Sequence, residues 1–197
     1  MQRLWVSGYR DYELGIFDPK APEVQVIKRV LKEKIVTWLN QQTEPTWLIT
    51  GPQPGVERWA LEVALKIQPD YPDFKLGMMR PFEGVGEQWK PARKEALDQI
   101  ELKLDYVGTL SKQPYQGPMQ LRAYQAFMFE HADEVLLVFD PERDNEAQRH
   151  AKAYYDYRLA KQKAADDGLK LQIVDFDELQ MAAEELAEEE RERKSGW

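Results

Sequence analysis

The stretch TWLITGPQPGVERWALEVALKIQ (46–68) decides the fold. Its first part, 46–50, is an apolar run that predicts a buried strand. The next residues, 51–55, contain two glycines and two prolines, which is typical of a tight loop. A helical pattern of apolar residues then occupies 55–68. The stretch therefore predicts a strand that enters a helix through a glycine-bearing loop.

The same alternation of strands and helices continues on both sides of this stretch. Strands are predicted at 3–7, 46–50, 74–79, 103–110, 134–140 and 169–176. Helices are predicted at 22–42, 55–68, 87–101, 118–132 and 145–168, and a charged helix follows residue 176. Alternation of this kind indicates repeated βαβ crossovers. The fold class is therefore α/β, with an open, mostly parallel sheet and helices on both faces.

Composition favours one domain and limits the partners. The 197 residues suit a single domain over 1–180, followed by an acidic charged tail over 181–197 that is helical or frayed. A hydrophobic content of 43% and a charged content of 31% exclude global disorder. The formal net charge of −8 argues against nucleic acid as a partner, because affinity for its backbone comes mostly from Lys and Arg.

The sequence also predicts a compartment. The chain has no cysteine, which excludes disulfides and thiolate metal sites and suits a reducing cytoplasm. No run approaches the roughly 18 apolar residues of a membrane span, and the first 15 residues lack the pattern of a signal peptide. We therefore expect a cytoplasmic protein without membrane contact. His131 and His150 have no carboxylate partners at metal-ligand spacing, so we expect no metal site.

Candidate ligand-binding residues follow the predicted strands, because the carboxyl ends of parallel strands share one edge of the sheet and ligands bind there. Glycines allow a ligand to approach the backbone, arginines pair with phosphates, and aromatic rings stack on bases. The candidates are Gly8, Tyr9, Arg10, Gly51, Gln53, Gly55, Val56, Glu57, Arg80, Phe82 and Asp140. This combination is typical of a nucleotide pocket.

The 51–55 loop is the strongest of these signals. The helix that follows it directs unpaired N–H groups and a partial positive charge toward the loop. Its two prolines each remove one donor, which leaves the N–H groups of Gln53, Gly55, Val56 and Glu57. Four donors are enough for one phosphate, but the GK[ST] element of a P-loop is missing.

Glu57 stands at the edge of the apolar face of the predicted helix, whereas Arg58, Glu62 and Lys66 form its solvent-exposed side. Two interpretations of Glu57 stay open. An acid in a first turn stabilises the helix N-terminus by about 0.3–1 kcal/mol. Alternatively, Glu57 accepts hydrogen bonds from ribose hydroxyls or acts as a base near the anomeric carbon. Direct contact with a phosphate is excluded, because like charges repel.

Five separate blocks of the chain resemble, in the same order, the YpsA-like family of small bacterial proteins, which occurs mainly in Firmicutes. The blocks are WVSGYRDYELGIF, LITGPQPGVERWALEVAL, MMRPFEGVGEQWK, LSKQPYQGPMQLRAYQAFMFEHADEVLLVFDPE and IVDFDELQ. The family belongs to the SLOG group, named for the Smf/DprA proteins and the LOG cytokinin-activating enzymes. The resemblance implies a Rossmann-like fold and a nucleotide or ADP-ribose-like ligand at a glycine loop that enters a helix.

The resemblance places the family's glycine-plus-acid motif on Gly51, Gly55 and Glu57. The segment GPQPGVE carries one residue more than the shorter loop of close relatives, and its two prolines are unusual. The LOG enzymes cleave a nucleoside monophosphate with a PGGxGTxxE motif, of which this chain has only the spaced glycine and acid. DprA-like proteins load recombinase onto single-stranded DNA and carry a basic surface, whereas this chain is acidic.

Three functional hypotheses follow. The first is a cytoplasmic sensor or regulator, linked to cell division, that binds a ligand such as NAD or ADP-ribose through the glycine loop, Glu57, and Arg10 or Arg80. The second is a phosphoribohydrolase or N-glycosidase in which Glu57 orients water or stabilises an oxocarbenium-like transition state. The third is a non-catalytic adaptor whose acidic tail contacts a protein partner. The resemblance also implies a homodimer, and no cofactor is assigned beyond the nucleotide-derived ligand.

Overall fold

The computed structural model describes residues 1–147 and 149–196. Six strands within these residues form one sheet in the order β4-β3-β2-β1-β5-β6, and every neighbouring pair is parallel. The strands are β1 (Gln2–Gly8), β2 (Thr46–Thr50), β3 (Phe74–Phe82), β4 (Tyr106–Ser111), β5 (Glu134–Val138) and β6 (Lys170–Val174). The predicted α/β class with a parallel sheet is confirmed.

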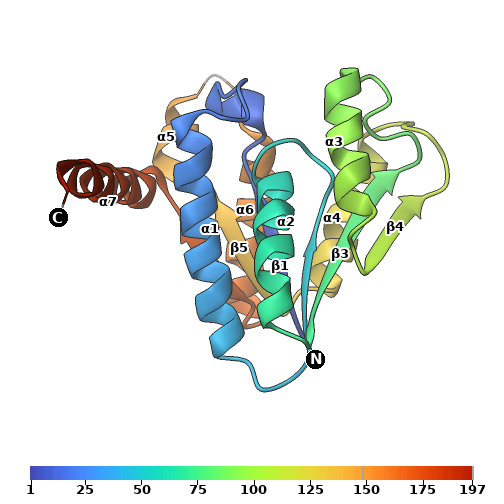
Figure 1. Cartoon of the computed structure of the whole chain (residues 1–197). Coiled ribbons are helices and arrows are strands. Elements are labelled where there is room, and N and C mark those ends of the chain that lie inside the picture. The colour runs from blue at the N-terminus through green and yellow to red at the C-terminus, as the bar shows by residue number, and fades with distance from the viewer. Residues whose placement is uncertain (148, 197) are drawn as a thin grey trace.

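Helices join the strands and cover both faces of the sheet (Figure 1). One face packs against α1, α2, α3 and α7, and the other against α4 and α6. The helices are α1 (Pro22–Asn40), α2 (Val56–Ile67), α3 (Pro91–Glu101), α4 (Pro118–Glu130), α5 (Pro141–Glu146), α6 (Lys152–Asp166) and α7 (Phe176–Ser195), with 3-10 turns η1 (Asp11–Leu14) and η2 (Gln68–Asp70). Together with the strand order, this two-sided cover makes the fold Rossmann-like.

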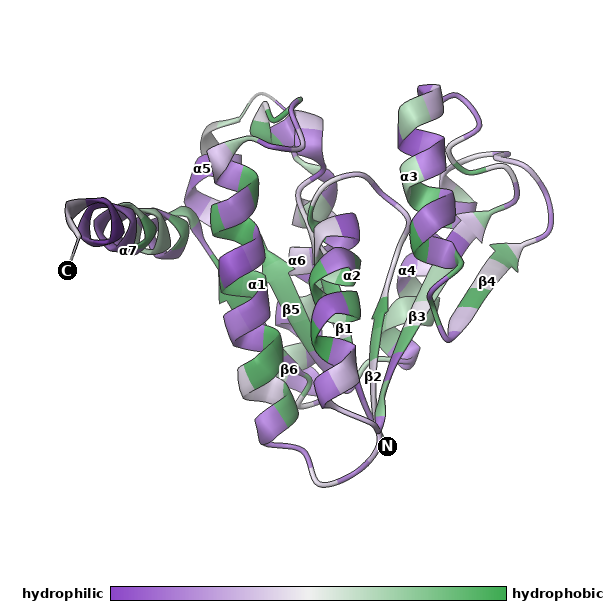
Figure 2. Cartoon of the chain, viewed as in Figure 1, coloured by the Kyte–Doolittle hydropathy of each residue, from purple (hydrophilic) through white to green (hydrophobic). Residues whose placement is uncertain are grey.

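The central strands are apolar because they are covered on both sides. Every residue of β5 is buried. Leu136 and Val138 face the α1–α2 side, whereas Val135 and Leu137 face the α4–α6 side. Figure 2 shows the central strands as hydrophobic and most of α7 as hydrophilic. Such uninterrupted apolar runs are expected of buried parallel strands.

The direction in which successive strands are added to the sheet reverses at β1. From β1 the chain steps outward through β2, β3 and β4, and then returns to place β5 and β6 on the other side of β1. Gly8 pairs with Val138 where β1 and β5 end. Open parallel sheets bind ligands at this edge, near the point of reversal. The fold therefore directs the search for a site to the carboxyl ends of the strands.

Two predicted helices have different bounds. The helix predicted over 87–101 begins at Pro91, because proline suits the first helical position and is unfavourable inside a helix. The helix predicted over 145–168 is two helices, α5 and α6. The Asp140 side chain caps α5, and Ala151 is extended (φ −66°, ψ 160°) immediately before α6. Residue 148 of that predicted helix lies outside the described residues.

Two other elements extend further than expected. The strand predicted over 74–79 continues to Phe82, which pairs with Ser111 of β4. Pro81 is tolerated there because the pairing of β3 with β2 already ends at Met78, so no hydrogen bond between those strands is lost. α7 runs to Ser195, so the described part of the acidic tail is helical. Residue 197, the last of the tail, lies outside the described residues.

Candidate functional site

A cleft of about 620 Å³ opens at the carboxyl edge of the sheet, between α4 and α6. Arg10 follows β1, Gln53 follows β2, Phe82 ends β3 and Tyr115 follows β4, so four strands deliver residues to it. The other lining residues are Pro52, Glu57, Pro81, Pro118, Leu121, Arg122, Tyr124, Gln125, Lys152, Tyr155 and Asp156. The cleft therefore lies where an open parallel sheet is expected to bind a ligand.

Two carboxylates and one ammonium group form the floor of the cleft. The Lys152 ammonium ion-pairs with Glu57 and with Asp156, the latter at 3.3 Å, and donates a hydrogen bond to Ser7 Oγ at 3.1 Å. Only 2% of Glu57 and 4% of Asp156 is exposed to solvent. Buried carboxylates are stable when they are paired in this way. The floor carries an excess of one formal negative charge and is rich in hydrogen-bond acceptors.

The charges of this floor keep Lys152 protonated. Burial by itself lowers the pKa of Lys152, but Asp156 and Glu57 raise it further than burial lowers it, so the pKa lies above the ordinary value for lysine. Asp156 is fixed by hydrogen bonds from Ser7 Oγ at 2.7 Å and from Gln125 Nε2 at 2.8 Å. These bonds join β1, α4 and α6 around one polar cluster.

Glu57 is oriented from two sides. The N–H of Gln53 donates to Glu57 Oε2 at 2.9 Å, and Lys152 contacts Oε1. Each oxygen thus has one protein partner, and a carboxylate oxygen can accept a second hydrogen bond. The side chain faces the loop and the cleft instead of the solvent around the start of α2.

The two loop glycines are required by close contacts with the protein itself. Gly55 has a φ of +116°, and a Cβ on it would lie 2.6 Å from the carbonyl oxygen of Tyr9. A Cβ on Gly51 would lie 2.4 Å from Glu57 Oε2 and 2.6 Å from the hydroxyl of Tyr124. Both glycines thus give room to protein groups that border the site.

Of the residues predicted to bind a ligand, Arg10, Gln53, Glu57 and Phe82 come together around the cleft. The remaining predicted residues do not line it. Gly8, Gly51, Gly55 and Val56 lie beneath it in the packed junction of β1, the loop and α2.

Three further predicted residues have partners away from the cleft. Tyr9 is buried, and its hydroxyl accepts a hydrogen bond from the N–H of Asp140 at 3.1 Å. The Asp140 carboxylate caps α5. Arg80 ion-pairs with Glu101 of α3 through two nitrogens, one of them at 3.1 Å.

Tyr124 is one of two residues lining the cleft that have a buried polar atom without a hydrogen-bond partner among the described residues; the other is Arg10, through its Nε. Tyr124 is only 7% exposed, and its hydroxyl is the atom that has no partner. Burial raises the pKa of Tyr124 well above its ordinary value, and the charges of Glu57 and Asp156 raise it further. The hydroxyl therefore keeps its proton and is available as a hydrogen-bond donor.

Arg58 is buried, so its prediction as part of the solvent-exposed side of the helix is wrong. Its guanidinium donates to the carbonyl oxygens of Pro52 (3.0 Å) and Arg93 (2.7 Å) and lies 4.6 Å from the ring centre of Trp89. Burial, followed by the charge of Arg93, lowers the pKa of Arg58 to about 10. The polar side of α2 is narrower than predicted because α3 and the loop before it cover this position.

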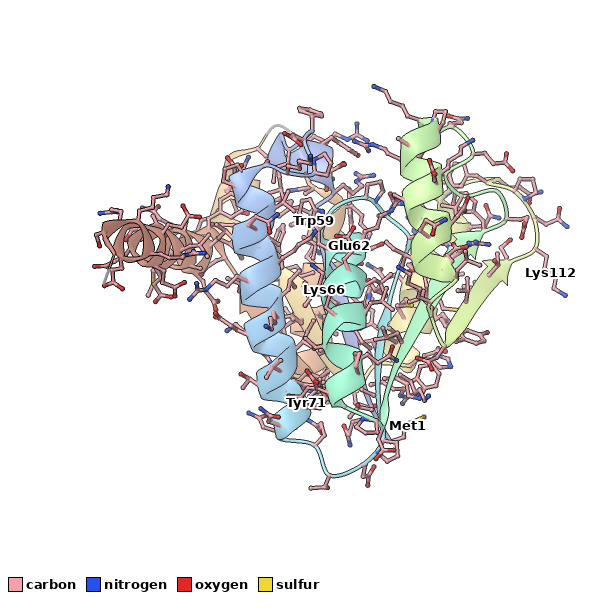
Figure 3. All side chains as sticks on the ribbon, viewed as in Figure 1. Met1, Trp59, Glu62, Lys66, Tyr71 and Lys112 are labelled. Carbon is pink, nitrogen blue, oxygen red and sulfur yellow. The ribbon has the colours of Figure 1, made fainter. Side chains whose placement is uncertain are left out.

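Figure 3 shows Glu62 and Lys66 on the outward side of α2. Glu62 ion-pairs with Lys28 of α1, and Lys66 is exposed. These two positions were predicted as solvent-facing.

Sequence reasoning did not find the α4 and α6 side of the cleft. Lys152 and Asp156 stand four residues apart, which places them on one side of a helix, but they were expected in the middle of a longer helix. Tyr124 and Gln125 lie in a helix that begins with proline and that carried no candidate. The available signal was the i, i+4 pair of opposite charges beside a tyrosine-rich apolar face.

The two histidines have ordinary local partners. His131 Nδ1 lies 2.8 Å from the carbonyl oxygen of Phe127, and His150 Nδ1 lies 2.6 Å from a carboxylate oxygen of Asp144. Residues 1–147 and 149–196 contain no group of three or more His, Cys, Asp or Glu arranged to hold a metal ion. None of the helices in this part of the chain is both long and apolar enough to cross a membrane.

A parallel sheet in this order, with a cleft between the helices of one face at its carboxyl edge, defines a Rossmann-like α/β protein. The family model YpsA, described as the YspA SLOG family, matches residues 4–179. The chain belongs to this SLOG family.

Curated relatives extend over nearly the same length. A UPF0398 protein of Limosilactobacillus reuteri is 45% identical over 193 residues, which cover 98% of each chain. A UPF0398 protein of Leuconostoc citreum is 40% identical over 192 residues, covering 98% of this chain and 97% of the relative. The family resemblance drawn from the sequence is confirmed.

The fold also resembles that of a solved structure. The DNA processing protein A (DprA) of Streptococcus pneumoniae matches with a TM-score of 0.53 and 15% identity. The match covers 96% of this chain and 56% of the DprA chain. At this level of identity the similarity concerns the fold alone, and it agrees with the Rossmann-like architecture.

Proposed function

We propose that the cleft binds a nucleotide-derived ligand and that the protein acts as a cytoplasmic sensor or regulator of it. Membership of the SLOG family suggests a nucleotide-related binding role. The observation that carries the proposal is the pair of buried carboxylates, Glu57 and Asp156, at the base of a cleft of about 620 Å³. Acidic side chains at the edge of such sheets accept hydrogen bonds from ribose hydroxyls.

The mouth of the cleft offers a surface for a base. The rings of Phe82 and Tyr115 lie with centroids 5.2 Å apart at an angle of 46°. Aromatic faces stack on planar rings, and cavities of about 300–1,000 Å³ are typical of small-molecule sites. The absence of cysteine suits action in a reducing cytoplasm.

A ligand screen tests this function. Thermal shift and calorimetry on the purified protein would use AMP, ADP, NAD, ADP-ribose and ribose 5-phosphate. We expect at least one of them to bind, and Glu57→Gln to weaken its binding about tenfold or more, because a charged acceptor contributes about 1.5–3 kcal/mol. Glu62→Gln, on the outward side of the same helix, is the matched control. Failure of all five compounds to bind, or equal affinities of the two variants, would contradict the proposal.

A second function is favoured by one observation, the second buried carboxylate. Two acids beside a sugar are the arrangement used to hydrolyse glycosidic bonds. Lys152 contacts both of them, so Glu57 acts in this hypothesis as a fixed charge that stabilises an oxocarbenium-like transition state. Chromatography of each bound ligand after incubation separates the two functions. Release of free base by the wild type but not by Glu57→Gln supports hydrolysis, and an unchanged ligand supports binding alone.

A further inference from the structure

The 51–55 loop has few groups left for a phosphate. Of the four N–H donors that the sequence assigns to it, Gln53 donates to Glu57 (2.9 Å) and Val56 donates to the carbonyl oxygen of Tyr9 (3.1 Å). The carbonyl oxygen of Pro54 accepts from the N–H of Asp11 at 3.1 Å, which holds the loop against the segment after β1. The Glu57 carboxylate adds a negative charge beside the 51–55 loop. The N–H groups of Gly55 and Glu57 remain, but the Glu57 carboxylate repels a phosphate there, so a different anchor suits a ligand phosphate better.

Three cations line the cleft, and two of them are paired. The Arg10 guanidinium ion-pairs with Glu13 at 2.7 Å through one nitrogen, while its buried Nε has no partner among the described residues. Lys152 has three acceptors, Glu57, Ser7 and Asp156, for its three ammonium protons. Arg122 of α4 is exposed and makes no ion pair or side-chain hydrogen bond with the residues that the structure describes. Arg122 is thus the cleft cation whose charge is not used within this part of the protein.

One side of α4 presents Arg122 to the cleft. Pro118, Leu121, Arg122 and Gln125 all line the cleft, and their spacing of three or four residues places them on one helical face. Gln125 donates a hydrogen bond to Asp156 of the floor. Pro118, at the other end of this face, is the first residue of the helix. Arg122 precedes Gln125 by three residues, or about 4.5 Å along the helix axis. Arg122 therefore lies closer to the mouth than the acidic floor does.

Tyr124, on the same helix, is a second residue of α4 with a polar group available to a ligand. Its hydroxyl is buried beside Gly51 and Glu57 and lacks a partner in the described part of the chain. A buried hydroxyl without a partner is costly, since its hydrogen bond to water has been lost. The hydroxyl oxygen is almost completely covered, so a ligand oxygen in the cleft would restore that hydrogen bond after a small shift of the side chain.

We propose that α4 binds the ligand through two side chains: Arg122 holds a phosphate near the mouth, and the Tyr124 hydroxyl donates to a ligand oxygen at the floor. The ligand class is a phosphorylated riboside whose sugar hydroxyls face Glu57 and Asp156. Its phosphate then lies on α4, away from the glycine loop. This inference rests on the proposed function, which assigns the sugar hydroxyls of the ligand to Glu57 and Asp156.

Calorimetry with adenosine and AMP tests the role of Arg122. The wild type binds AMP more tightly than adenosine. Arg122→Gln weakens AMP binding about tenfold or more, as expected for a charge-assisted hydrogen bond, and leaves adenosine binding unchanged. Ribose 5-phosphate and ribose form a second pair with the same expected difference. Arg191→Gln removes the same charge from an exposed position of α7 and leaves both affinities unchanged.

Tyr124→Phe tests the hydroxyl separately. The substitution removes no hydrogen bond to the described residues, so the melting temperature stays the same or rises. The affinities for adenosine and AMP both fall about three- to tenfold, the range of a neutral hydrogen bond. A lower melting temperature with unchanged affinities would overturn the assigned role of Tyr124.

The outcomes separate this inference from the proposed function. If AMP binding depends on Glu57 but not on Arg122, or if Arg122→Gln weakens adenosine and AMP equally, the phosphate position on α4 is wrong and the proposed function stands. If the wild type binds none of adenosine, AMP and ribose 5-phosphate, the inference is wrong, and the proposed function falls with it only if ADP, NAD and ADP-ribose also fail to bind.

Discussion

Gly51 shows how one residue without a side chain shapes the site. Its φ lies outside the left-handed region, so its backbone conformation is open to other residues. The space beside it is filled by the Glu57 carboxylate and the Tyr124 hydroxyl, at 2.4 and 2.6 Å from the position of a Cβ. The glycine is therefore needed for close packing of two polar groups at the floor of the cleft.

We predict that Gly51→Ala destabilises the protein by about 1–3 kcal/mol, the usual cost of an extra methyl group in a packed site. The added carbon must push Glu57 or Tyr124 from its position, so ligand binding weakens as well. Urea unfolding measures the first effect. The control is Gly77→Ala in β3, where a Cβ would meet the Trp47 ring at an ordinary 3.5 Å. Equal stability of the two variants would contradict this account of Gly51.

At the scale of elements, Asp105 connects the beginning of β4 to β3 through hydrogen bonds. Its carboxylate accepts hydrogen bonds from the N–H of Leu76 (2.9 Å), from Gln68 (2.8 Å) and from Lys75 (3.0 Å). Burial raises the pKa of Asp105, but these hydrogen bonds and the charge of Lys75 lower it below its ordinary value. The ionised form is therefore the one that stabilises the folded protein.

The sign of the pH dependence follows from this lowered pKa. Asp105 stabilises the fold fully above its unfolded pKa, near 4, and the contribution is lost as the pH falls through the lower folded pKa. At pH 7, Asp105→Asn should lower the free energy of unfolding by about 1 kcal/mol. The difference from wild type should shrink between pH 4 and pH 2 in urea titrations. Asp98→Asn, at an exposed position of α3, should show no such trend, and a constant difference for Asp105→Asn would refute the assignment.

At the scale of the whole molecule, α7 extends away from the body that holds the cleft (Figure 1). Ala182 is buried, and Leu179, Ala183 and Leu186 pack partly against the core. Beyond them, the contacts of α7 with α1 include the exposed ion pair of Glu189 with Arg29 at 2.7 Å. The first half of α7 is thus part of the fold, and the second half is joined to it by charges.

We predict that ending the chain after residue 187 leaves the urea midpoint at physiological salt unchanged, because exposed ion pairs contribute little. Ending it after residue 181 should lower the midpoint, since Ala182, Ala183 and Leu186 are then lost. Similar losses for the two truncations would show that the charged half of α7 is structural. If ending the chain after residue 187 instead abolishes binding to a protein partner, the adaptor hypothesis gains support.

Much of the fold could be predicted from local pattern. Apolar runs such as 134–138 and the 46–68 stretch have the length and spacing of buried strands and amphipathic helices, and alternation determines a parallel sheet. The break between α5 and α6 was missed because it depends on Asp144, whose carboxylate accepts from the N–H of Ala151 at 2.9 Å. A side chain that reaches seven residues along the chain leaves no periodic signal.

The glycine-loop side of the cleft could be predicted because it follows strands directly. The other side of the cleft could not be predicted. Its residues Lys152, Asp156 and Tyr124 come together only when α4 and α6 pack over β1 and the loop. A tyrosine or lysine in a helix has the same local pattern whether it lies in a cleft or on the surface. The burial of Arg58 was missed for the same reason, because it depends on Trp89 and Arg93.

The ion pair of Lys152 with Glu57 joins residues that are 95 positions apart in the chain. During synthesis the ribosome completes α2 long before it reaches α6, so Glu57 has no counter-ion until the last quarter of the chain emerges. A fragment that stops before residue 152 would have to bury a lone carboxylate or keep it in water. The polar floor should therefore be among the last parts to become native, and incomplete chains should be unable to take up the ligand.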